Sequence, residues 1–144
     1  MTNPSVFVVD TNVLVAGLVT GASDSPVATI VDAMLAGKLL YLLSPALLEE
    51  YRSVLLRPKL AGLHGLTEAE VDHLLVEITA NALWREPTET GGAPDPGDNH
   101  LWALLGAYAG SRLVTGDRLL HREPPTGNSV ISPATWFREV GQAL

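Results

Sequence analysis

The stretch SVFVVDTNVLVAGL, residues 5–18, combines the pattern of a short β-strand with a charged residue at the end of that strand. The segment from Ser5 to Val9 is β-branched and aromatic, which is typical of a strand buried on both faces. Asp10 follows directly, and the apolar pattern resumes at Val13. An unpaired charge at the edge of a core is energetically costly. Asp10 is therefore the first candidate functional residue.

The composition indicates one compact domain that spans residues 1–144. The chain has no cysteine, which excludes a disulfide framework and a thiolate metal site. Its longest apolar stretch, Leu39 to Leu48, is interrupted by Ser44-Pro45 and is too short to span a bilayer. The N-terminus lacks the basic and apolar regions of a secretion signal. We therefore expect a soluble, cytoplasmic protein that does not associate with membranes.

Strand-like and helix-like segments alternate along the chain. The predicted strands are Ser5–Val9, Leu39–Leu43, Ala82–Trp84, Arg112–Thr115 and Ser129–Ile131. The predicted helices begin at Ser25-Pro26, Ser44-Pro45, Thr67, Asp95 and Ser132-Pro133. This alternation predicts an α/β fold, a three-layer α/β/α sandwich with a mostly parallel sheet of about five strands.

Acidic residues fall where such a sheet binds its ligands, beyond the carboxyl ends of the strands. Asp10 ends the first predicted strand, and Asp117 follows the fourth. Asp98 lies in the first turn of a predicted helix. On the helix after Ser44-Pro45, Glu50 borders the buried face, whereas Glu49 points nearly opposite. The pattern predicts that four carboxylates meet at one edge.

Each acid taken alone also has a structural explanation. Asp98 fits a charge that favours a helix N-terminus, and Asp117 fits a turn. Glu50 fits an ion pair with Arg57 or a charge exposed to solvent. The net charge of -7 alone fits a role in solubility. Four carboxylates at one edge would nevertheless repel one another, and a divalent cation removes that repulsion. Oxygen ligands favour Mg²⁺ or Mn²⁺ over zinc.

Four segments of the sequence together resemble a known family. They are VVDTNVLVAGL (residues 8–18), LSPALLEEYRSVLLRPKL (43–60), PDPGDNHLWALLGAYAGSRLVTGD (94–117) and VISPATWF (130–137). In this order and spacing they resemble PIN-domain proteins, most closely the VapC-like toxin components of toxin–antitoxin pairs. The resemblance implies a PIN fold and Mg²⁺- or Mn²⁺-dependent endoribonuclease activity. It also implies an RNA substrate, a cognate antitoxin protein and a homodimer.

The resemblance also assigns roles to individual residues. The family's catalytic acids match Asp10, Glu50, Asp98 and Asp117, of which Asp10, Asp98 and Asp117 would hold the metal. The small polar residues that support the site match Thr11, Asn12 and Thr115. Beside Asp117, Arg118 is near enough to contact an RNA phosphate. Where many relatives carry a further acid, this chain has Leu119, so the binding of a second metal is an open question.

Other classes of protein fit the sequence less well. A phosphatase of the haloacid-dehalogenase type requires an aspartate where this chain has Asn12, and a receiver domain requires a lysine after the fifth strand. The sequence contains no nucleotide-binding P-loop, and its histidines lack metal-binding spacing. The remaining alternative is a weakly active or inactive PIN scaffold that binds RNA or a partner protein.

Overall fold

The computed structural model describes residues 5–89 and 91–144, in which short parallel strands alternate with helices. The strands are β1 (Phe7–Val9), β2 (Leu42–Leu43), β3 (Leu83–Trp84), β4 (Arg112–Val114) and β5 (Ser129–Ile131). The helices are α1 (Thr11–Val19), α2 (Pro26–Leu35), α3 (Pro45–Leu55), α4 (Pro58–His64), α5 (Glu68–Ala80), α6 (Asn99–Gly106), α7 (Arg118–Arg122) and α8 (Pro133–Glu139). Two 3₁₀ turns, η1 (Pro96–Asp98) and η2 (Gly141–Ala143), complete the described elements.

The strands pair in two parallel ladders. One ladder has the order β1-β4-β5 and the other pairs β2 with β3. A single parallel bridge between Phe7 and Tyr41 connects the two ladders, which gives the spatial order β3-β2-β1-β4-β5. The predicted parallel α/β arrangement is confirmed, but the five strands form a three-stranded and a two-stranded ladder. The β2 ladder ends before Pro45 because proline has no backbone N–H to donate.

Most helix starts follow the pattern predicted from the sequence. The side chains of Ser25, Ser44 and Ser132 each accept a hydrogen bond from a backbone N–H in the first turn, and each is followed by proline. Thr67 and Glu70 form the predicted capping box at the start of α5. These local signals fix where α2, α3, α5 and α8 begin.

The structure adds three helices to those predicted. Residues 13–19, predicted only as an apolar segment, belong to α1, which Asp10 caps by accepting a hydrogen bond from the Thr11 N–H. Pro58 ends α3 but also begins α4, since proline is well tolerated in a first helical turn. Asp117 caps the short helix α7. Two of the predicted site acids therefore also begin helices.

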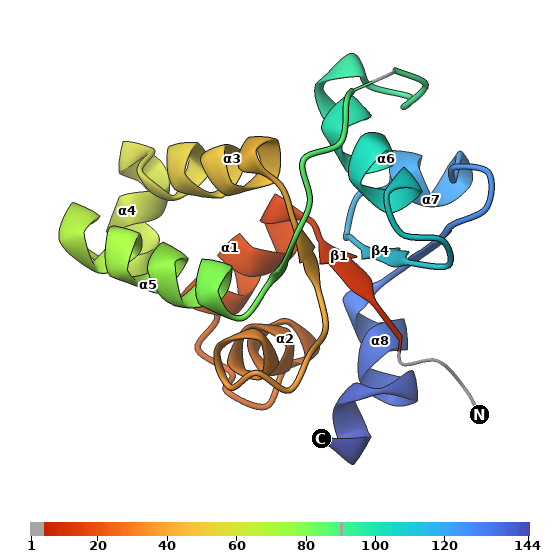
Figure 1. Cartoon of the computed structure of the whole chain (residues 1–144). Helices are drawn as coiled ribbons and strands as arrows, with labels where there is room; N and C mark the ends of the chain where they lie inside the picture. Colours follow the sequence, from red (N-terminus) through yellow and green to blue (C-terminus); the bar gives the residue numbers. More distant parts are fainter. Residues whose placement is uncertain (1–4, 90) are drawn as a thin grey trace.

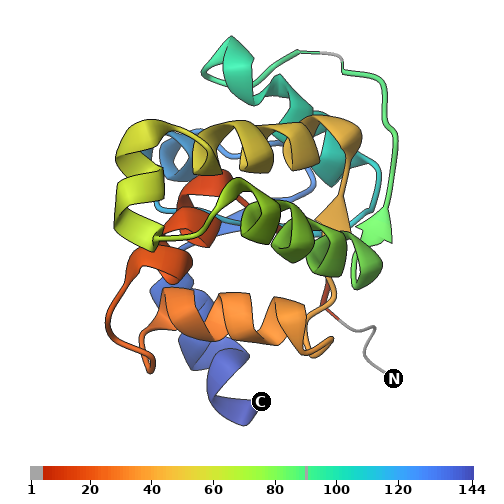
Figure 2. The same ribbon diagram turned by 90° about the vertical axis from the view of Figure 1, so that its left-hand side faces the viewer.

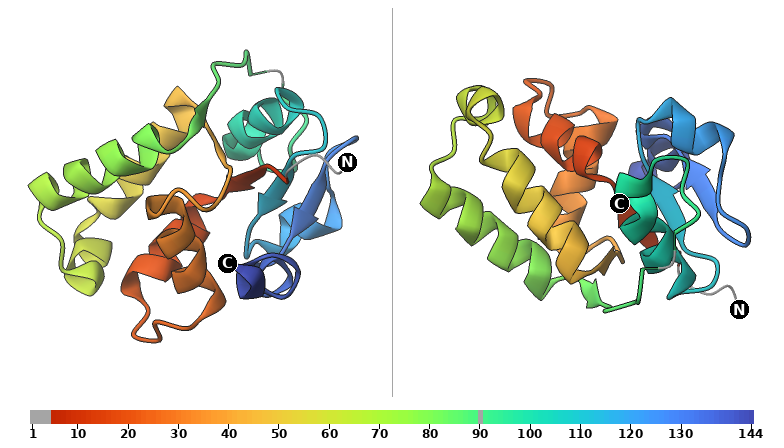
Figure 3. Two further views of the ribbon diagram at one scale, coloured as in Figure 1. Left: turned by 60° about the horizontal axis from the view of Figure 1, so that its bottom comes forward. Right: turned by 90° about the horizontal axis from the view of Figure 1, so that it is seen from above.

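The helices form groups on either side of the strands. Helices α1 to α5 gather on one side of β1, and α6 and α7 lie on the other (Figures 1 and 3). Within the first group, α3 and α5 run side by side, with α2 below them in Figure 2. Helices α1 and α2 approach closely at Gly17, where a Cβ atom would overlap Val31 and lie 2.6 Å from the Val27 carbonyl oxygen. None of the described helices has the length and apolar character required to cross a membrane.

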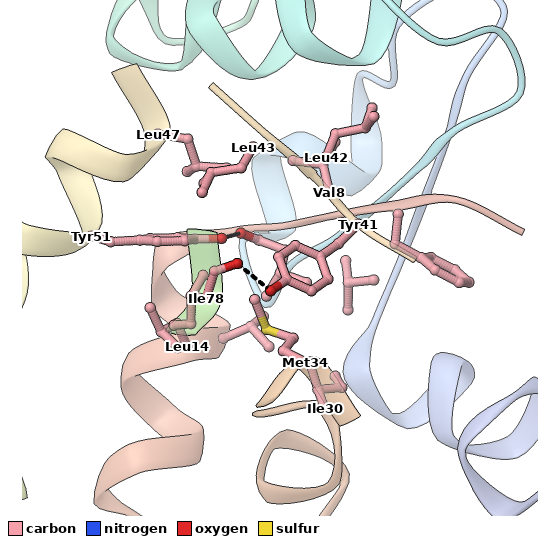
Figure 4. Close-up of a cluster of buried hydrophobic side chains, with 14 of the residues drawn as sticks. Val8, Leu14, Ile30, Met34, Tyr41, Leu42, Leu43, Leu47, Tyr51 and Ile78 are labelled. Atoms are coloured by element: carbon pink, nitrogen blue, oxygen red, sulfur yellow. Dashed lines mark hydrogen bonds between the residues drawn. The ribbon is translucent and has the colours of Figure 1, made fainter. Parts of the chain in front are cut away.

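Two buried tyrosines connect the core to neighbouring elements. The Tyr41 hydroxyl donates a hydrogen bond to the Ile78 carbonyl oxygen at 2.5 Å, amid the side chains of Ile30 and Met34 (Figure 4). The Tyr51 hydroxyl of α3 donates to the carbonyl oxygen of Val9, the last residue of β1, also at 2.5 Å. Because this bond is fully buried, it fixes α3 against the carboxyl end of β1. Glu50, the residue before Tyr51, is thereby held beside Asp10.

Candidate active site

A cleft of about 420 Å³ lies at the carboxyl ends of β1 and β4. It is lined by Asp10, Thr11, Asn12, Val15, Ala16, Glu50, Val54, Leu60, Asp98 and Asp117. All four acids predicted from the sequence thus line one cleft, although they come from four separate segments of the chain. The strand-end position of Asp10 and Asp117 and the helical phase of Glu50 explain why they meet.

Asp10 is the most deeply buried of these acids, with only 7% of its surface exposed. Its Oδ1 accepts a hydrogen bond from the Thr11 N–H at 2.8 Å, and its Oδ2 accepts one from the Thr115 hydroxyl at 2.7 Å. Burial raises the pKa of Asp10, and the charges of Glu50 and Asp117 raise it further. The two hydrogen bonds oppose this shift and fix the orientation of the carboxylate.

Thr115 and Asn12 connect the end of β1 to the turn after β4. The Thr115 hydroxyl accepts hydrogen bonds from the Asp117 N–H at 3.0 Å and the Asn12 side-chain amide at 3.2 Å. The Asn12 side-chain oxygen accepts one from the Gly116 N–H at 3.3 Å. Asp117 itself accepts a hydrogen bond from the Leu119 N–H at 2.9 Å. This network holds Asp10 and Asp117 on the same rim of the cleft.

Glu50 faces the cleft, as its position on the helix predicts. It is partly buried, whereas its neighbour Glu49 is exposed. The Thr11 hydroxyl donates a hydrogen bond to Glu50 Oε2 at 2.5 Å. The alternative explanation of Glu50 as the ion-pair partner of Arg57 is not supported, since the salt bridges of the described residues do not include this pair. Glu50 is therefore linked to the β1–α1 junction.

Asp98 lies at the junction of η1 and α6, and its side chain makes no capping hydrogen bond there. Burial raises its pKa to about 6, together with the charges of Asp10, Asp95, Glu50 and Asp117. Asp95 has the capping role instead, since its exposed carboxylate accepts a hydrogen bond from the Gly97 N–H at 2.9 Å. Asp95 is therefore the cap, and Asp98 lies in the first turn, as predicted, with its carboxylate free to face the cleft.

A family model described as PIN domain matches residues 6–119 of the chain. The chain belongs to the PIN-domain family. PIN domains are in general metal-dependent nucleases and typically bind a divalent metal. The matched residues include all four acids of the cleft. Searches of curated proteins and of solved structures found no match.

His100 is a residue of this PIN domain that the sequence analysis did not identify as part of the site. It lies on α6, two positions after Asp98, and its Nε2 is 3.6 Å from Glu50 Oε2. Ligand atoms of Glu50, Asp98 and His100 all lie within 4.8 Å of one another. The His100 imidazole lowers the pKa of Glu50, and Glu50 in turn raises the pKa of His100. The spacing of the histidines in the sequence does not reveal this contact, because the partner of His100 is a glutamate on another helix.

The donor set of the cleft fits a divalent cation. Its carboxylate oxygens are hard ligands of the kind that Mg²⁺ and Mn²⁺ prefer. The pKa values of Asp10 and Asp98 are raised by burial and also by mutual repulsion among the acids. Binding of a cation relieves this repulsion and favours the ionised carboxylates. Arg118, the residue predicted to contact RNA, is exposed at the start of α7.

Proposed function

We propose that this PIN domain is a metal-dependent endoribonuclease that hydrolyses RNA phosphodiester bonds and acts as the toxin of a toxin–antitoxin pair. The observation that carries the proposal is the convergence of Asp10, Glu50, Asp98 and Asp117 on one cleft. The chain brings these acids together from four segments, despite the burial and the mutual repulsion that raise the pKa values of Asp10 and Asp98. A site built in this way suits chemistry that requires a bound cation.

In this proposal Asp10, Asp98 and Asp117 hold Mg²⁺ or Mn²⁺. Asp10 enters the reaction already oriented, since each of its oxygens accepts a hydrogen bond. Asp117 is fixed through its own N–H and through its bond to the Leu119 N–H. The bound cation supplies Lewis-acid activation of a phosphate oxygen and of a water molecule.

Glu50 is proposed to orient the attacking water and to accept its proton. His100 lowers its pKa, which keeps the carboxylate ionised and able to accept a hydrogen bond from the water, although the same shift makes it a weaker base. In the hydrolysis the water oxygen bonds to phosphorus, and the bond from phosphorus to the leaving nucleotide oxygen breaks. The proton lost by the water passes to Glu50, and the leaving oxygen gains a proton from solvent.

The proposed substrate and partners follow from the family resemblance and from charge. With a net charge of -7, the protein has little general attraction for nucleic acid, so RNA binding would depend on the cation and on local contacts such as Arg118. A cognate antitoxin would block the cleft, and a homodimer is the proposed form. We propose the cytoplasm as its location because cellular RNA is available there.

The direct test is incubation of the purified protein with mixed cellular RNA and Mg²⁺ or Mn²⁺, followed by mapping of the cleaved ends. We expect new ends at defined positions, none in EDTA, and none with Asp10→Asn. DNA of matching sequence is the control for the substrate class. For the toxin role, induced expression of the native protein should arrest growth of the host, and Asp10→Asn should not.

The same experiment distinguishes the alternative, a PIN scaffold with little activity. Leu119, at the position where many relatives carry a further acid, is the observation that favours this alternative. A scaffold would bind RNA equally well with and without metal and would leave it intact. Intact RNA after prolonged incubation with either cation would exclude the nuclease proposal.

A further inference from the structure

Both contacts that hold the Glu50 side chain involve the same oxygen atom. Thr11 Oγ1 donates to Glu50 Oε2 at 2.5 Å, and His100 Nε2 lies 3.6 Å from that same Oε2. The other oxygen, Oε1, accepts no hydrogen bond from the residues that the structure describes. The carboxylate is thus held from one side, by α1 and by α6, and keeps one oxygen for a ligand.

We infer that His100 is a positioning residue that, with Thr11, holds Glu50 by Oε2 so that Oε1 receives the attacking water. The inference rests on the proposed nuclease function and adds to it a residue outside the four acids. His100 does not touch the substrate in this arrangement. It acts only through Glu50.

The surroundings of His100 suit a fixed donor. Its side chain is only 11% exposed, whereas the Glu50 side chain is 33% exposed. It also lines a small pocket of about 160 Å³, whose other walls are the start of α3, the segment 86–89 and Ala103 of α6. The imidazole therefore projects from α6 toward the start of α3 and is largely shielded from solvent. A packed ring loses little further side-chain entropy when it orients a neighbour.

In the neutral tautomer with the proton on Nε2, this N–H faces Glu50 Oε2 at a nitrogen–oxygen distance of 3.6 Å, and Nδ1 carries no proton. His100 Nδ1 is buried and has no hydrogen-bond partner among the described residues. A protonated Nδ1 would leave a buried donor unsatisfied, which is more costly than an unpaired acceptor lone pair. Of the two neutral tautomers, the one with its proton on Nε2 is therefore favoured.

The first test measures the contact in the absence of metal and RNA. Urea unfolding of four proteins, the native chain, His100→Leu, Glu50→Ala and the double variant, forms a double-mutant cycle. If His100 acts on Glu50, the shift in the urea midpoint caused by His100→Leu in the native chain differs from that in the Glu50→Ala chain. Additive midpoints would overturn the inference, whether or not the protein cleaves RNA.

The second test measures cleavage and compares two variants that fill the space of the ring. His100→Gln keeps an N–H donor of similar reach, whereas His100→Leu removes it. We expect His100→Leu to lower kcat about tenfold with KM within about twofold, and His100→Gln to stay within about twofold of native. In the Glu50→Ala background, His100→Leu should cause no further loss. A rise in KM without a fall in kcat would mean that His100 contacts RNA, and equal defects in both variants would exclude a role as donor.

A matched control is available on α5. His73 Nε2 lies 3.4 Å from Glu77 Oε1, in an exposed histidine–glutamate pair remote from the cleft lining. His73→Leu should leave kcat, KM and the response to Glu50→Ala unchanged. If native protein shows no cleavage at all, the nuclease proposal fails, while the unfolding cycle still decides whether His100 holds Glu50.

Discussion

The end of β1 and helix α3 are joined by two neighbouring contacts with opposite consequences. In the core, the Val9 carbonyl oxygen accepts a hydrogen bond from the Tyr51 hydroxyl. In the cleft, the Thr11 hydroxyl donates a hydrogen bond to the Glu50 carboxylate. The two contacts involve residues on either side of Asp10 and successive residues of α3. The first joins neutral groups, and the second holds a charge beside other charges. One junction therefore serves stability, and the other maintains a charged site at a cost in stability.

The two contacts differ in how burial affects the ionisation of the groups involved. Burial raises the pKa of Tyr51 far above its ordinary value, so its hydroxyl stays neutral and its hydrogen bond is retained at any ordinary pH. In the cleft, burial raises the pKa values of Asp10 and Asp98 and so opposes their ionisation, although a cation binds the ionised carboxylates. The core contact should thus be insensitive to metal, and the cleft contact should depend on it.

The largest expected effect is loss of cleavage on Asp10→Asn. Asparagine keeps the shape of the side chain but removes the charge at the centre of the acidic cluster. We expect the cleavage rate to fall on the order of a thousandfold, roughly 4 kcal/mol in the barrier, as measured with labelled RNA. Mn²⁺ should raise the thermal midpoint of native protein by mass action and should barely shift that of the variant.

The control for this prediction is Asp24→Asn, an exposed acid in the loop before α2. It should retain both the activity and the stabilisation by metal. A full Mn²⁺ shift in Asp10→Asn would contradict the assignment of the metal to this cleft.

The next effect concerns the core contact and stability alone. Tyr51→Phe leaves the buried Val9 carbonyl oxygen without its donor, which should cost about 1–3 kcal/mol in the free energy of unfolding. Urea unfolding in EDTA and in Mn²⁺ should give the same loss. Below the unfolding transition, kcat should stay within about twofold of native. A loss of kcat above tenfold in fully folded Tyr51→Phe would show that the two contacts are not separable.

A smaller effect separates two adjacent glutamates. Glu50→Gln should lower the cleavage rate at least tenfold, about 1.4 kcal/mol in the barrier, because the base in the cleft is lost. Glu49→Gln, on the exposed side of α3, should change neither rate nor stability. Both variants are measured at the same Mg²⁺ concentration. An essential Glu49 and a dispensable Glu50 would reverse the assignment.

The smallest effect is the pH dependence of metal-free stability. The pKa of Asp98 is about 6 in the folded protein, above its ordinary value of 3.8, so the folded state binds more protons between these values. Its contribution to stability is therefore present below about pH 4 and is lost as the pH rises through 6. Asp98→Asn should remove this loss, with a gain at pH 7 below about 1 kcal/mol because solvent screens the group.

The measurement is the thermal midpoint of native protein and Asp98→Asn in EDTA from pH 4 to 7. The difference between the two midpoints should grow with pH, in favour of the variant. Excess Mg²⁺ should cancel it. A difference that is constant across this range would exclude repulsion among the acids as the cause.

Much of the fold could be predicted because its signals are local. Serine–proline pairs begin α2, α3 and α8, and short β-branched runs mark the strands. Helix α1 was harder to recognise because residues 13–19 are apolar throughout, and such a run has no helical period to detect. The sheet consists of two ladders that only a single bridge between Phe7 and Tyr41 connects, and no local sequence pattern predicts this arrangement.

The site was predictable to the extent that topology or helical phase places its residues. Strand ends place Asp10 and Asp117, and the helical period separates Glu50 from Glu49. His100 was missed because its contact with Glu50 depends on how α6 packs against α3. A contact of that kind appears only when the whole chain is folded.

The strand order β3-β2-β1-β4-β5 has a consequence for the synthesis of the protein on the ribosome. The chain begins at the centre of the sheet, builds one edge, and adds the other edge last. Asp10 and Glu50 leave the ribosome early, whereas Asp98 and Asp117 follow only with the segment that pairs β4 against β1. Until translation reaches Asp98, the nascent chain carries at most Asp10 and Glu50 of the acidic cluster, and the domain folds as a unit only when its later segments are present. The complete cleft can form only once translation has passed Asp117.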